Sequence, residues 1–456
     1  MKTDVALMTK GSIYKQIVAF ALPIFWGQLF QQLYNIVDSV VVGHYVGRSA
    51  LAAVTSTGSL VQLIVGLFVG IFMGAGVVIS KYFGAENHSY VRRAVHATIS
   101  FGIISGIILT GVGVAFTPQF LKWMGTPADV FDQAVAYLRV YFMGGLFLAM
   151  YNATSGIFQA VGDSRHPLYY LIISSLLNVV LDLLLVAVFH MGVEGAAIAT
   201  VFSQFVGVVF ALTKLGRTRE IYRVQLRRIG FDRKVLGEII RTGLPSGIQN
   251  SVISIANVVV QSNINAFGSA AMAGCGAFSK AEGLAFIPIT SFSMAMSTFI
   301  GQNLGAQKYS RAKKGARFGI AVCCVIAELC GIAFYFAAPY VIALFNNEAA
   351  VLAVGTAMTK VISPFFFMLA LSHCAAGIMR GAGRAIVPML VMLTCWCVIR
   401  VSYLAIMTRF IPKIEVVFWA YPLTWFLSSA FFAIYLLKSD WVHSYDRLQS
   451  RAAARD

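Results

Sequence analysis

The sequence predicts an all-α polytopic membrane protein with twelve transmembrane helices, arranged as two six-helix bundles. The first observation is the composition, because 59% of the 456 residues are hydrophobic and only 12% are charged, whereas a soluble domain carries about 25% charged residues. The second is a series of apolar segments that reach the roughly 20 residues a membrane-spanning helix needs. The third is an internal repeat that relates the two halves of the chain. Together these observations exclude a soluble globular protein.

Apolar segments long enough to cross a bilayer recur throughout both halves of the chain. The predicted spans are residues 15–42, 50–80, 91–117, 131–160, 167–190, 195–215, 236–266, 271–300, 315–338, 350–379, 386–408 and 416–437. Several exceed the required length and are expected to tilt or to protrude. Small residues spaced four apart, such as Gly66, Gly70 and Gly74, let neighbouring helices approach closely in lipid.

The two halves align at an offset of 221 residues. GRSALAAV, which begins at Gly47, aligns with GSAAMAGC, which begins at Gly268, and GIFQAVGDSRHP aligns with GIMRGAGRAIVP at the same offset. Six helices are an even number, so the second copy enters the membrane from the same side as the first, as in parallel repeats. The predicted domains are an N-terminal bundle at 1–215, a basic cytoplasmic linker at 216–235, a C-terminal bundle at 236–438 and a cytoplasmic tail at 439–456.

Membrane topology explains the formal net charge of +17. When loops are assigned alternately to two sides, 27 of the 35 Lys and Arg residues fall on one side of the membrane. Cytoplasmic loops of membrane proteins carry such an excess of Lys and Arg, so both termini are predicted to be cytoplasmic. A basic chain can also bind nucleic acid, but this distribution leaves no need for a nucleic-acid partner.

A carboxylate interrupts the first apolar segment, in the stretch QQLYNIVDSVVVG. The polar residues of this segment share one broad helical face at 100° per residue. They are Gln28, Gln31 or Gln32, Asn35 and Asp38. A charged side chain that faces lipid is costly, so Asp38 is expected to face the bundle interior or a wet cavity and to have a partner there.

The fifth predicted span offers a partner for Asp38. In SSLLNVVLDLLL, Asn178 and Asp182 are four residues apart and share a face, and the sixth span adds Thr200. Two carboxylates, an amide and a hydroxyl suit either a hard monovalent cation such as Na⁺ or a shared proton. The alternative is that these groups only hold packed helices together through hydrogen bonds. We predict a coupling site for H⁺ or Na⁺ at these four residues.

The second half lacks these acids. The positions that match Asp38 and Asp182 at the 221-residue offset are Val259 and Tyr403. Because neither side chain carries a carboxylate, ion binding is predicted in the first bundle only.

Other polar residues of the spans are weaker candidates for lining a substrate cavity. They are Gln28, Gln32, Asn35, Asn257, Gln261 and Glu282. Glu282 is predicted either to bind a cationic substrate or to pair with a basic residue such as Arg400. Aromatic residues, which make up 13% of the chain, suit flat lipophilic cations through cation–π contacts.

Short motifs connect these predictions to a known family. ALP opens the first span, VDSVVVG closes it, and QAVGDSRHP is paired with RGAGRAIVP in the second half. In these motifs and in its two repeats of six helices, the chain resembles bacterial members of the multidrug and toxic compound extrusion (MATE) family over essentially its whole length. The resemblance implies a V-shaped pair of six-helix bundles that exports organic, mostly cationic lipophilic compounds by antiport with H⁺ or Na⁺.

The resemblance also implies residue roles. Prokaryotic members hold their coupling cation in the first bundle, with an Asp on helix 1, an Asn and an Asp four apart on helix 5 and a Thr on helix 6. Asp38, Asn178, Asp182 and Thr200 match these positions. The resemblance further implies a multi-pass protein of the plasma (inner) membrane that is not an enzyme and needs no cofactor besides its coupling ion. Its expected partners are small lipophilic cations and membrane lipid, and two bundles in one chain favour a functional monomer.

Three other functions compete with this interpretation. Flippases for lipid-linked oligosaccharides share the two-bundle plan, and Arg139, Lys280 and Arg400 favour their pyrophosphate-bearing substrate, although the inward-facing acids oppose an anion. A membrane enzyme is disfavoured because the sequence contains no HExxH, P-loop or GxSxG motif. A channel does not need titratable acids confined to one of two repeats.

Overall fold

Helices are the regular structure of the described chain, which comprises residues 7–230 and 232–446 of the computed structural model. Within this part no strand is present, in agreement with the predicted all-α class. Residues 1–6 of the predicted N-terminal bundle, residue 231 of the predicted linker and residues 447–456 of the predicted tail lie outside the described residues.

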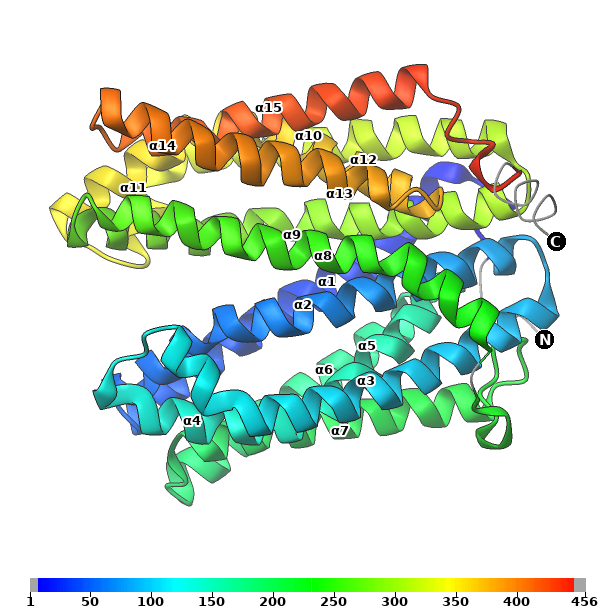
Figure 1. The fold of residues 1–456 in the computed structure, drawn as a ribbon, viewed down its shortest axis with the longest axis horizontal. Coiled ribbons are helices and arrows are strands. Elements are labelled where there is room, and N and C mark those ends of the chain that lie inside the picture. The colour runs from blue at the N-terminus through cyan, green and yellow to red at the C-terminus, as the bar shows by residue number, and fades with distance from the viewer. Residues whose placement is uncertain (1–6, 231, 447–456) are drawn as a thin grey trace. The chain divides into compact units, whose positions relative to one another are not determined.

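The first half of the described chain forms seven α-helices, which Figure 1 labels. They are α1 (Ile13–Tyr45), α2 (Arg48–Gly84), α3 (His88–Trp123), α4 (Ala128–Met143), α5 (Gly145–Ala160), α6 (Arg165–Asp182) and α7 (Gly192–Arg217). α6 passes without a break into a π-helical segment at Leu183–Val188. A short 3₁₀ turn at Leu226–Arg228 lies in the linker that follows α7.

The second half repeats this order, and two short non-α segments interrupt its helices. Its helices are α8 (Arg233–Asn265), α9 (Ser269–Gly305), α10 (Tyr309–Ala343), α11 (Ala349–Ile362), α12 (Phe366–Gly381), α13 (Ile386–Met392), α14 (Arg400–Phe410) and α15 (Glu415–Lys438). A 3₁₀ turn at Ser363–Phe365 joins α11 to α12, and a π-helical segment at Leu393–Ile399 joins α13 to α14.

Each of the twelve predicted spans coincides with one helix or with consecutive helices. In the described residues, ten helical stretches are long and apolar enough to cross a membrane, and α4 with α5 makes an eleventh across a bend of 50°. α8 has the necessary length, but its polar side chains make it less apolar than these eleven stretches. The prediction of an all-helical, multi-pass chain with about twelve helices is therefore confirmed.

Packing divides the chain into two compact units whose limits fall inside helices. The first unit consists mainly of Leu22–Gly247, and the second of Met8–Ala21 with the chain from Ile248 onward. Both α1 and α8 therefore contribute residues to each unit. The domain limits proposed from the sequence repeat stay a prediction.

Glycines hold two helices of the first unit in direct backbone contact. A Cβ atom added at Gly70 of α2 would lie 2.1 Å from the backbone nitrogen of Gly247, and one added at Gly74 would lie 2.3 Å from that of Gly243. No larger residue fits at either position of α2 without a backbone shift. The predicted close approach at Gly70 and Gly74 is confirmed, and it attaches the first part of α8 to the first unit.

The second unit holds the segment that precedes α1. Met8 donates its backbone N–H to Gln302 Oε1 at 2.9 Å, and Asn303 Nδ2 donates to the Met8 carbonyl at 3.2 Å. Lys308 Nζ donates to the Thr9 carbonyl at 2.8 Å. Because Gln302 and Asn303 are fully buried, these bonds attach the segment to the end of α9.

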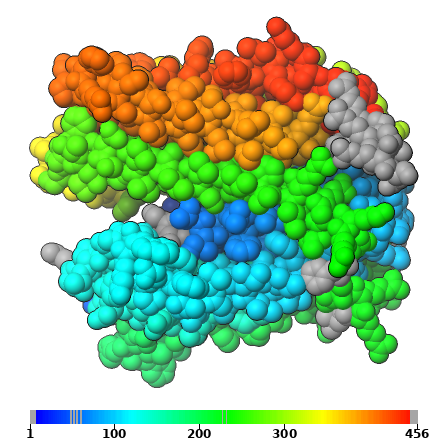
Figure 2. All heavy atoms as spheres, in the orientation of Figure 1, coloured from blue at the N-terminus to red at the C-terminus, as the bar shows by residue number. Residues whose placement is uncertain are grey.

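The outer surfaces of both units are apolar, as contact with lipid tails requires. α3, in cyan in Figure 2, leaves about half or more of Ile107, Ile108 and Phe116 exposed. The orange surface of α13 and α14 does the same with Leu390 and Ile406. Monomeric soluble proteins rarely expose extended apolar patches, so these surfaces agree with a membrane environment.

Candidate functional site

Two acids from different helices come together inside the first unit. Asp38 of α1 is 9% exposed, and Asp182, the last residue of α6, is fully buried. Their carboxyl groups lie close enough to interact electrostatically. Among the described residues, no amide, amine or hydroxyl group donates a hydrogen bond to either oxygen of Asp182. Two buried carboxylates within electrostatic reach repel each other when both are ionised, so the pair requires a proton or a cation.

The backbone changes its helical geometry directly after Asp182. Residues Leu183–Val188 form a π-helical segment, in which the Phe189 N–H donates to the Leu184 carbonyl at 2.9 Å. Single π turns inside α-helices occur frequently at functional sites. The segment places Asp182 at the junction of two helical geometries. Neither the apolar sequence LLLVAV nor its spacing indicates this change.

Asn178 and Thr200 extend the acid pair toward α7. Asn178 lies one turn before Asp182 on the same face of α6 and is 2% exposed. Its Nδ2 donates to Thr200 Oγ1 at 3.4 Å, and Thr200 Oγ1 donates to the Ala196 carbonyl at 3.1 Å. Asn178 Oδ1 is buried and receives no hydrogen bond from the described residues. The four predicted coupling residues therefore gather from α1, α6 and α7 in one unit.

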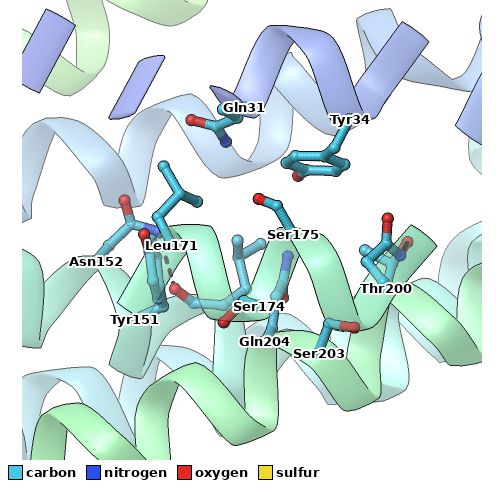
Figure 3. A pocket seen from close by; sticks show the side chains of 12 residues that line it. Gln31, Tyr34, Tyr151, Asn152, Leu171, Ser174, Ser175, Thr200, Ser203 and Gln204 are labelled. Atoms are coloured by element: carbon cyan, nitrogen blue, oxygen red, sulfur yellow. Dashed lines mark hydrogen bonds between the residues drawn. The ribbon is translucent and has the colours of Figure 1, made fainter. Parts of the chain in front are cut away.

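A polar cavity of about 140 Å³ borders this group of residues. Its lining residues come from α1, α5, α6 and α7, and their side chains converge on a common space in Figure 3. They are Gln31, Tyr34, Leu148, Tyr151, Asn152, Leu171, Ser174, Ser175, Asn178, Thr200, Ser203 and Gln204. Buried hydroxyl oxygens at Ser174, Ser175 and Ser203 have no partner in the described chain, so they are available to water or an ion.

The size of the cavity limits its content. One water occupies about 30 Å³ of liquid, so a volume of about 140 Å³ accommodates an ion with a few waters. Drug-sized ligands usually occupy pockets of about 300–1,000 Å³. The cavity therefore suits a small ion or water, and a drug-sized substrate requires more space than it offers.

Two tyrosines that the sequence analysis did not select lie within electrostatic reach of the acid pair. Tyr34 lines the cavity from α1 and interacts with both Asp38 and Asp182. Tyr137 of α4 is 8% exposed and interacts with the same two acids. Tyr34 could have been found, because it lies four residues before Asp38 and so shares its helical face. No pattern in the sequence connects Tyr137 to these acids.

The weaker candidates on α1 are not among the residues that line the cavity. Gln31 is the amide of this helix that lines it, whereas Gln28 and Gln32 are half-buried and Asn35 is exposed. The predicted polar face is therefore present, but only part of it borders the space near Asp38. A role of these three residues in substrate binding stays a prediction.

Two weaker candidates of the second unit lie on α8. Asn257 and Gln261 are both exposed, and Gln261 Nε2 donates to Asn265 Oδ1 at 2.9 Å. This bond joins residues four apart on one helix. It does not connect α8 to polar groups of another helix. The predicted cavity role of both residues is untested.

Glu282 of α9 lies within electrostatic reach of a buried arginine. Arg400 is 2% exposed, and its Nε and Nη2 donate to Thr424 Oγ1 at 3.3 and 2.8 Å. Its guanidinium lies 5.2 Å from the ring centre of Trp396 and 4.7 Å from that of Tyr421. Glu282 and Arg400 interact electrostatically, but no ion pair within 4.0 Å joins them in the described chain.

Comparison with known proteins identifies the family. The family model described as MatE matches residues 23–184 and 245–406, two segments that begin 222 residues apart. That separation agrees within one residue with the 221-residue repeat. The probable multidrug resistance protein YoeA of Bacillus subtilis (strain 168) is 27% identical over 83% of this chain and 84% of its own length. The probable multidrug resistance protein NorM of Thermotoga maritima is 26% identical over 83% and 82%.

A solved structure shows the same fold. It is described as an outward-facing multidrug resistance MATE family transporter of the MOP superfamily, and it matches with a TM-score of 0.88 and 22% identity over 99% of both chains. Since the two segments matched by the family model also make up more than half of the sequence, the chain belongs to the MATE family of multidrug efflux transporters and is a multi-pass membrane transporter rather than an enzyme.

Proposed function

We propose that this transporter is a secondary antiporter that exports organic, mostly cationic lipophilic compounds in exchange for H⁺ or Na⁺. The observation that carries the proposal is the burial of Asp38 and Asp182 within electrostatic reach of each other. Among the described residues, the groups that interact electrostatically with the pair are tyrosines such as Tyr34 and Tyr137, and no Lys, Arg or His side chain is one of them. The positive charge that the pair requires must therefore come from solution.

The remaining site residues suit either coupling ion. A proton can be shared between the two carboxyl groups with no further ligand. A Na⁺ ion prefers oxygen ligands, and Asn178 Oδ1 and Thr200 Oγ1 add two such atoms to the carboxylates. The polar cavity next to these residues offers space for a hydrated ion.

Coupling requires that the ion bind with different affinity in the two access states of the transporter. We infer that an ion bound at Asp38 and Asp182 favours release of the exported compound, and that the empty acids favour a new organic cation. The names of the relatives, which call them probable multidrug resistance proteins, support broad substrate selection.

The orientation and the oligomeric state belong to the same proposal. The excess of Lys and Arg on one side supports a transporter of the plasma membrane with both termini in the cytoplasm. Because Asp38, Asn178, Asp182 and Thr200 all come from one chain, one copy supplies the whole coupling site. We therefore propose a functional monomer.

The test is transport of a fluorescent lipophilic cation in proteoliposomes. A pH gradient and a Na⁺ gradient are imposed separately on wild type, Asp38→Asn and the control Asp132→Asn, which changes an exposed acid of α4. We expect one gradient to drive transport in wild type and control, and Asp38→Asn to reduce it to background. If neither gradient drives the wild type, or if Asp38→Asn transports as well as wild type, the antiport proposal is wrong.

A further inference from the structure

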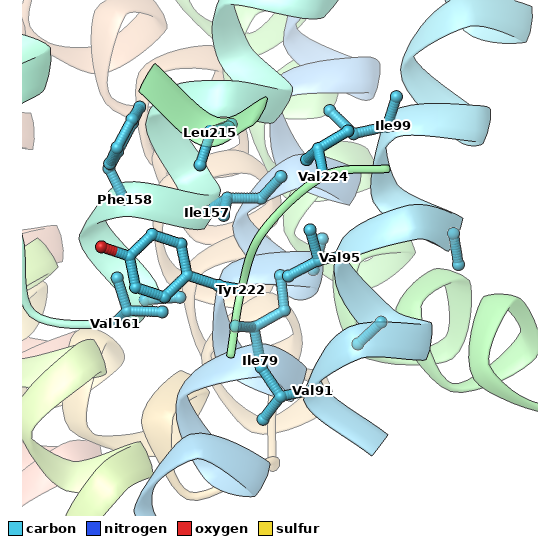
Figure 4. Packing of buried hydrophobic residues seen from close by; sticks show 14 of the residues in the cluster. Ile79, Val91, Val95, Ile99, Ile157, Phe158, Val161, Leu215, Tyr222 and Val224 are labelled. Atoms are coloured by element: carbon cyan, nitrogen blue, oxygen red, sulfur yellow. The ribbon is translucent and has the colours of Figure 1, made fainter. Parts of the chain in front are cut away.

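The linker between α7 and α8 is anchored in the core of the first unit. Tyr222 and Val224 are 2% and 6% exposed and belong to one hydrophobic cluster with residues of α2, α3, α5 and α7. Figure 4 shows both side chains among Ile79, Val91 and Val95. A connection that only spanned the gap between two helices would not need buried side chains. The anchors instead hold this linker in a defined position.

Hydrogen bonds fix the linker at three further points. The Val224 N–H donates to the Leu215 carbonyl at 3.0 Å. The Gln225 N–H donates to His96 Nε2, and Ser100 Oγ donates to the Gly230 carbonyl, each at 3.0 Å. His96 and Ser100 lie four residues apart on α3, so one face of that helix holds both sides of the 3₁₀ turn. The linker therefore presents its outer side chains from a rigid base.

The outer side chains of this linker are mostly arginine. The exposed basic residues that begin at the end of α7 are Arg217, Arg219, Arg223, Arg227, Arg228, Arg233 and Lys234. The acids of the same stretch are Glu220 and Asp232. Asp232 is already engaged, because its Oδ2 pairs with Arg93 at 3.2 Å and its Oδ1 accepts the backbone N–H groups of Lys234 and Val235. The surface has a large excess of positive charge.

We propose that this linker surface binds the headgroups of anionic phospholipids in the leaflet next to it. Clusters of four to eight Lys and Arg residues directly after a membrane-spanning helix are typical of anionic-lipid recognition, and here the cluster follows α7 at once. A guanidinium binds phosphate oxygens in a bidentate manner. Because the linker is already ordered, binding costs little further conformational entropy. This surface is separate from the acid pair, so the inference does not depend on the coupling ion.

The test uses the full chain in a neutral detergent with short-chain lipids as probes. The midpoint of thermal unfolding is measured with dioctanoyl-phosphatidylglycerol and with dioctanoyl-phosphatidylcholine at equal concentrations. For wild type we expect the anionic lipid to raise the midpoint by about 2–4 °C more than the zwitterionic lipid, because a ligand that binds the folded state stabilises it. This difference should disappear at about 1 M salt, where charge interactions are screened.

The variant Arg217→Gln, Arg219→Gln, Arg227→Gln, Arg228→Gln should lose at least half of the difference between the two lipids. The matched control removes four exposed basic residues of the second unit, Lys313→Gln, Lys314→Gln, Arg317→Gln, Lys438→Gln, and should keep it. If the fourfold linker variant does not fold, the double variant Arg227→Gln, Arg228→Gln replaces it. This variant should also reduce the difference between the two lipids, by a smaller amount. The proposal is overturned if wild type shows no difference, if the linker variant keeps it, if the control loses it equally, or if glycerol phosphate alone reproduces it.

Discussion

Ser175 and Gln204 line the polar cavity of the first repeat, and the 221-residue offset pairs them with Trp396 and Trp425 in the second. Both tryptophans are buried, at 8% and 2% exposure, and Trp396 Nε1 donates to Ser428 Oγ at 3.2 Å. Two indole rings thus occupy the second repeat where small polar side chains leave room in the first. At these two positions, one fold with the same helix order holds either the wall of a cavity or two buried indole rings.

The two repeats also differ in the charged side chains that they bury. The first repeat buries Asp38 and Asp182 within electrostatic reach of each other, whereas the second buries Arg400 against Thr424 with Glu282 in electrostatic reach. A guanidinium that belongs to the chain supplies the positive charge of the second repeat permanently. The acids of the first repeat must obtain theirs from solution. The comparison therefore supports ion coupling in the first repeat and a fixed, charge-balanced scaffold in the second.

The largest expected effect comes from removing an acid of the first repeat. Asp182→Asn leaves the volume of the side chain almost unchanged but abolishes the electrostatic interaction between two ionisable groups. Because the ion then loses the differential binding that shifts the access states, gradient-driven transport in proteoliposomes should fall by about a hundredfold or more. The exposed-acid control Asp132→Asn should transport like wild type. Transport by Asp182→Asn at more than half of the wild-type rate would show that the acid pair only packs helices.

Removing the resident cation of the second repeat should act on stability. Arg400→Met deletes two charge-assisted hydrogen bonds to Thr424 and the contacts with Trp396 and Tyr421, and we expect a loss of about 2 kcal/mol in the free energy of unfolding. Thermal unfolding in detergent measures the loss. The double variant Arg400→Met, Glu282→Gln should recover part of it, because no acid is left without a cation. An unchanged midpoint for Arg400→Met would contradict the scaffold role.

Converting one position of the first repeat into its counterpart tests the comparison directly. Ser175→Trp places an indole at the wall of the cavity, as in the second repeat, and should lower gradient-driven transport by about tenfold because the space for the ion is filled. Ser175→Ala is the matched control and should keep the cavity and most of the transport. Thermal unfolding separates a filled cavity from an unfolded protein. Equal transport by Ser175→Trp and wild type would mean that the ion does not use this space.

The sequence predicts the helices well because each span carries its own hydropathy signal. It does not predict the break between α4 and α5, where a Cβ at Gly144 would lie 2.5 Å from Cγ2 of Val201, because that contact joins residues far apart in sequence. The same limit holds for the site. Helical periodicity indicates that Asp38 and Asp182 both face inward, but only the tertiary structure shows that they lie within electrostatic reach of each other.

The other residues of the two charged clusters differ in how far the sequence predicts them. Tyr34 shares the helical face of Asp38, so helical periodicity could have predicted its position near the acids. Tyr137 comes near the acids through tertiary packing alone. The two alternatives for Glu282 were both consistent with the sequence. The structure places Glu282 near Arg400 without a close ion pair, which depends on the exact distance between α9 and α14 and has no signature in the sequence.

The smallest expected effect comes from Glu282→Gln. If Glu282 only balances part of the charge of Arg400 over a distance beyond an ion pair, its neutral analogue removes a weak interaction, and transport should change by about twofold or less. The response to the driving gradient should stay as in wild type. Glu348→Gln, which changes an exposed acid next to α11, is the matched control for the loss of one carboxylate.

A large effect of Glu282→Gln would alter the comparison between the repeats. If the variant lost transport of a lipophilic cation about tenfold while Arg400→Met kept its stability, Glu282 would act on the substrate and not on the arginine. The apparent affinity for the cation then distinguishes the roles, because a residue that binds substrate raises the half-saturating concentration, whereas a residue of the scaffold lowers the amount of folded protein. Measuring both quantities on the same preparation decides whether the second repeat takes part in transport chemistry or only supports the first.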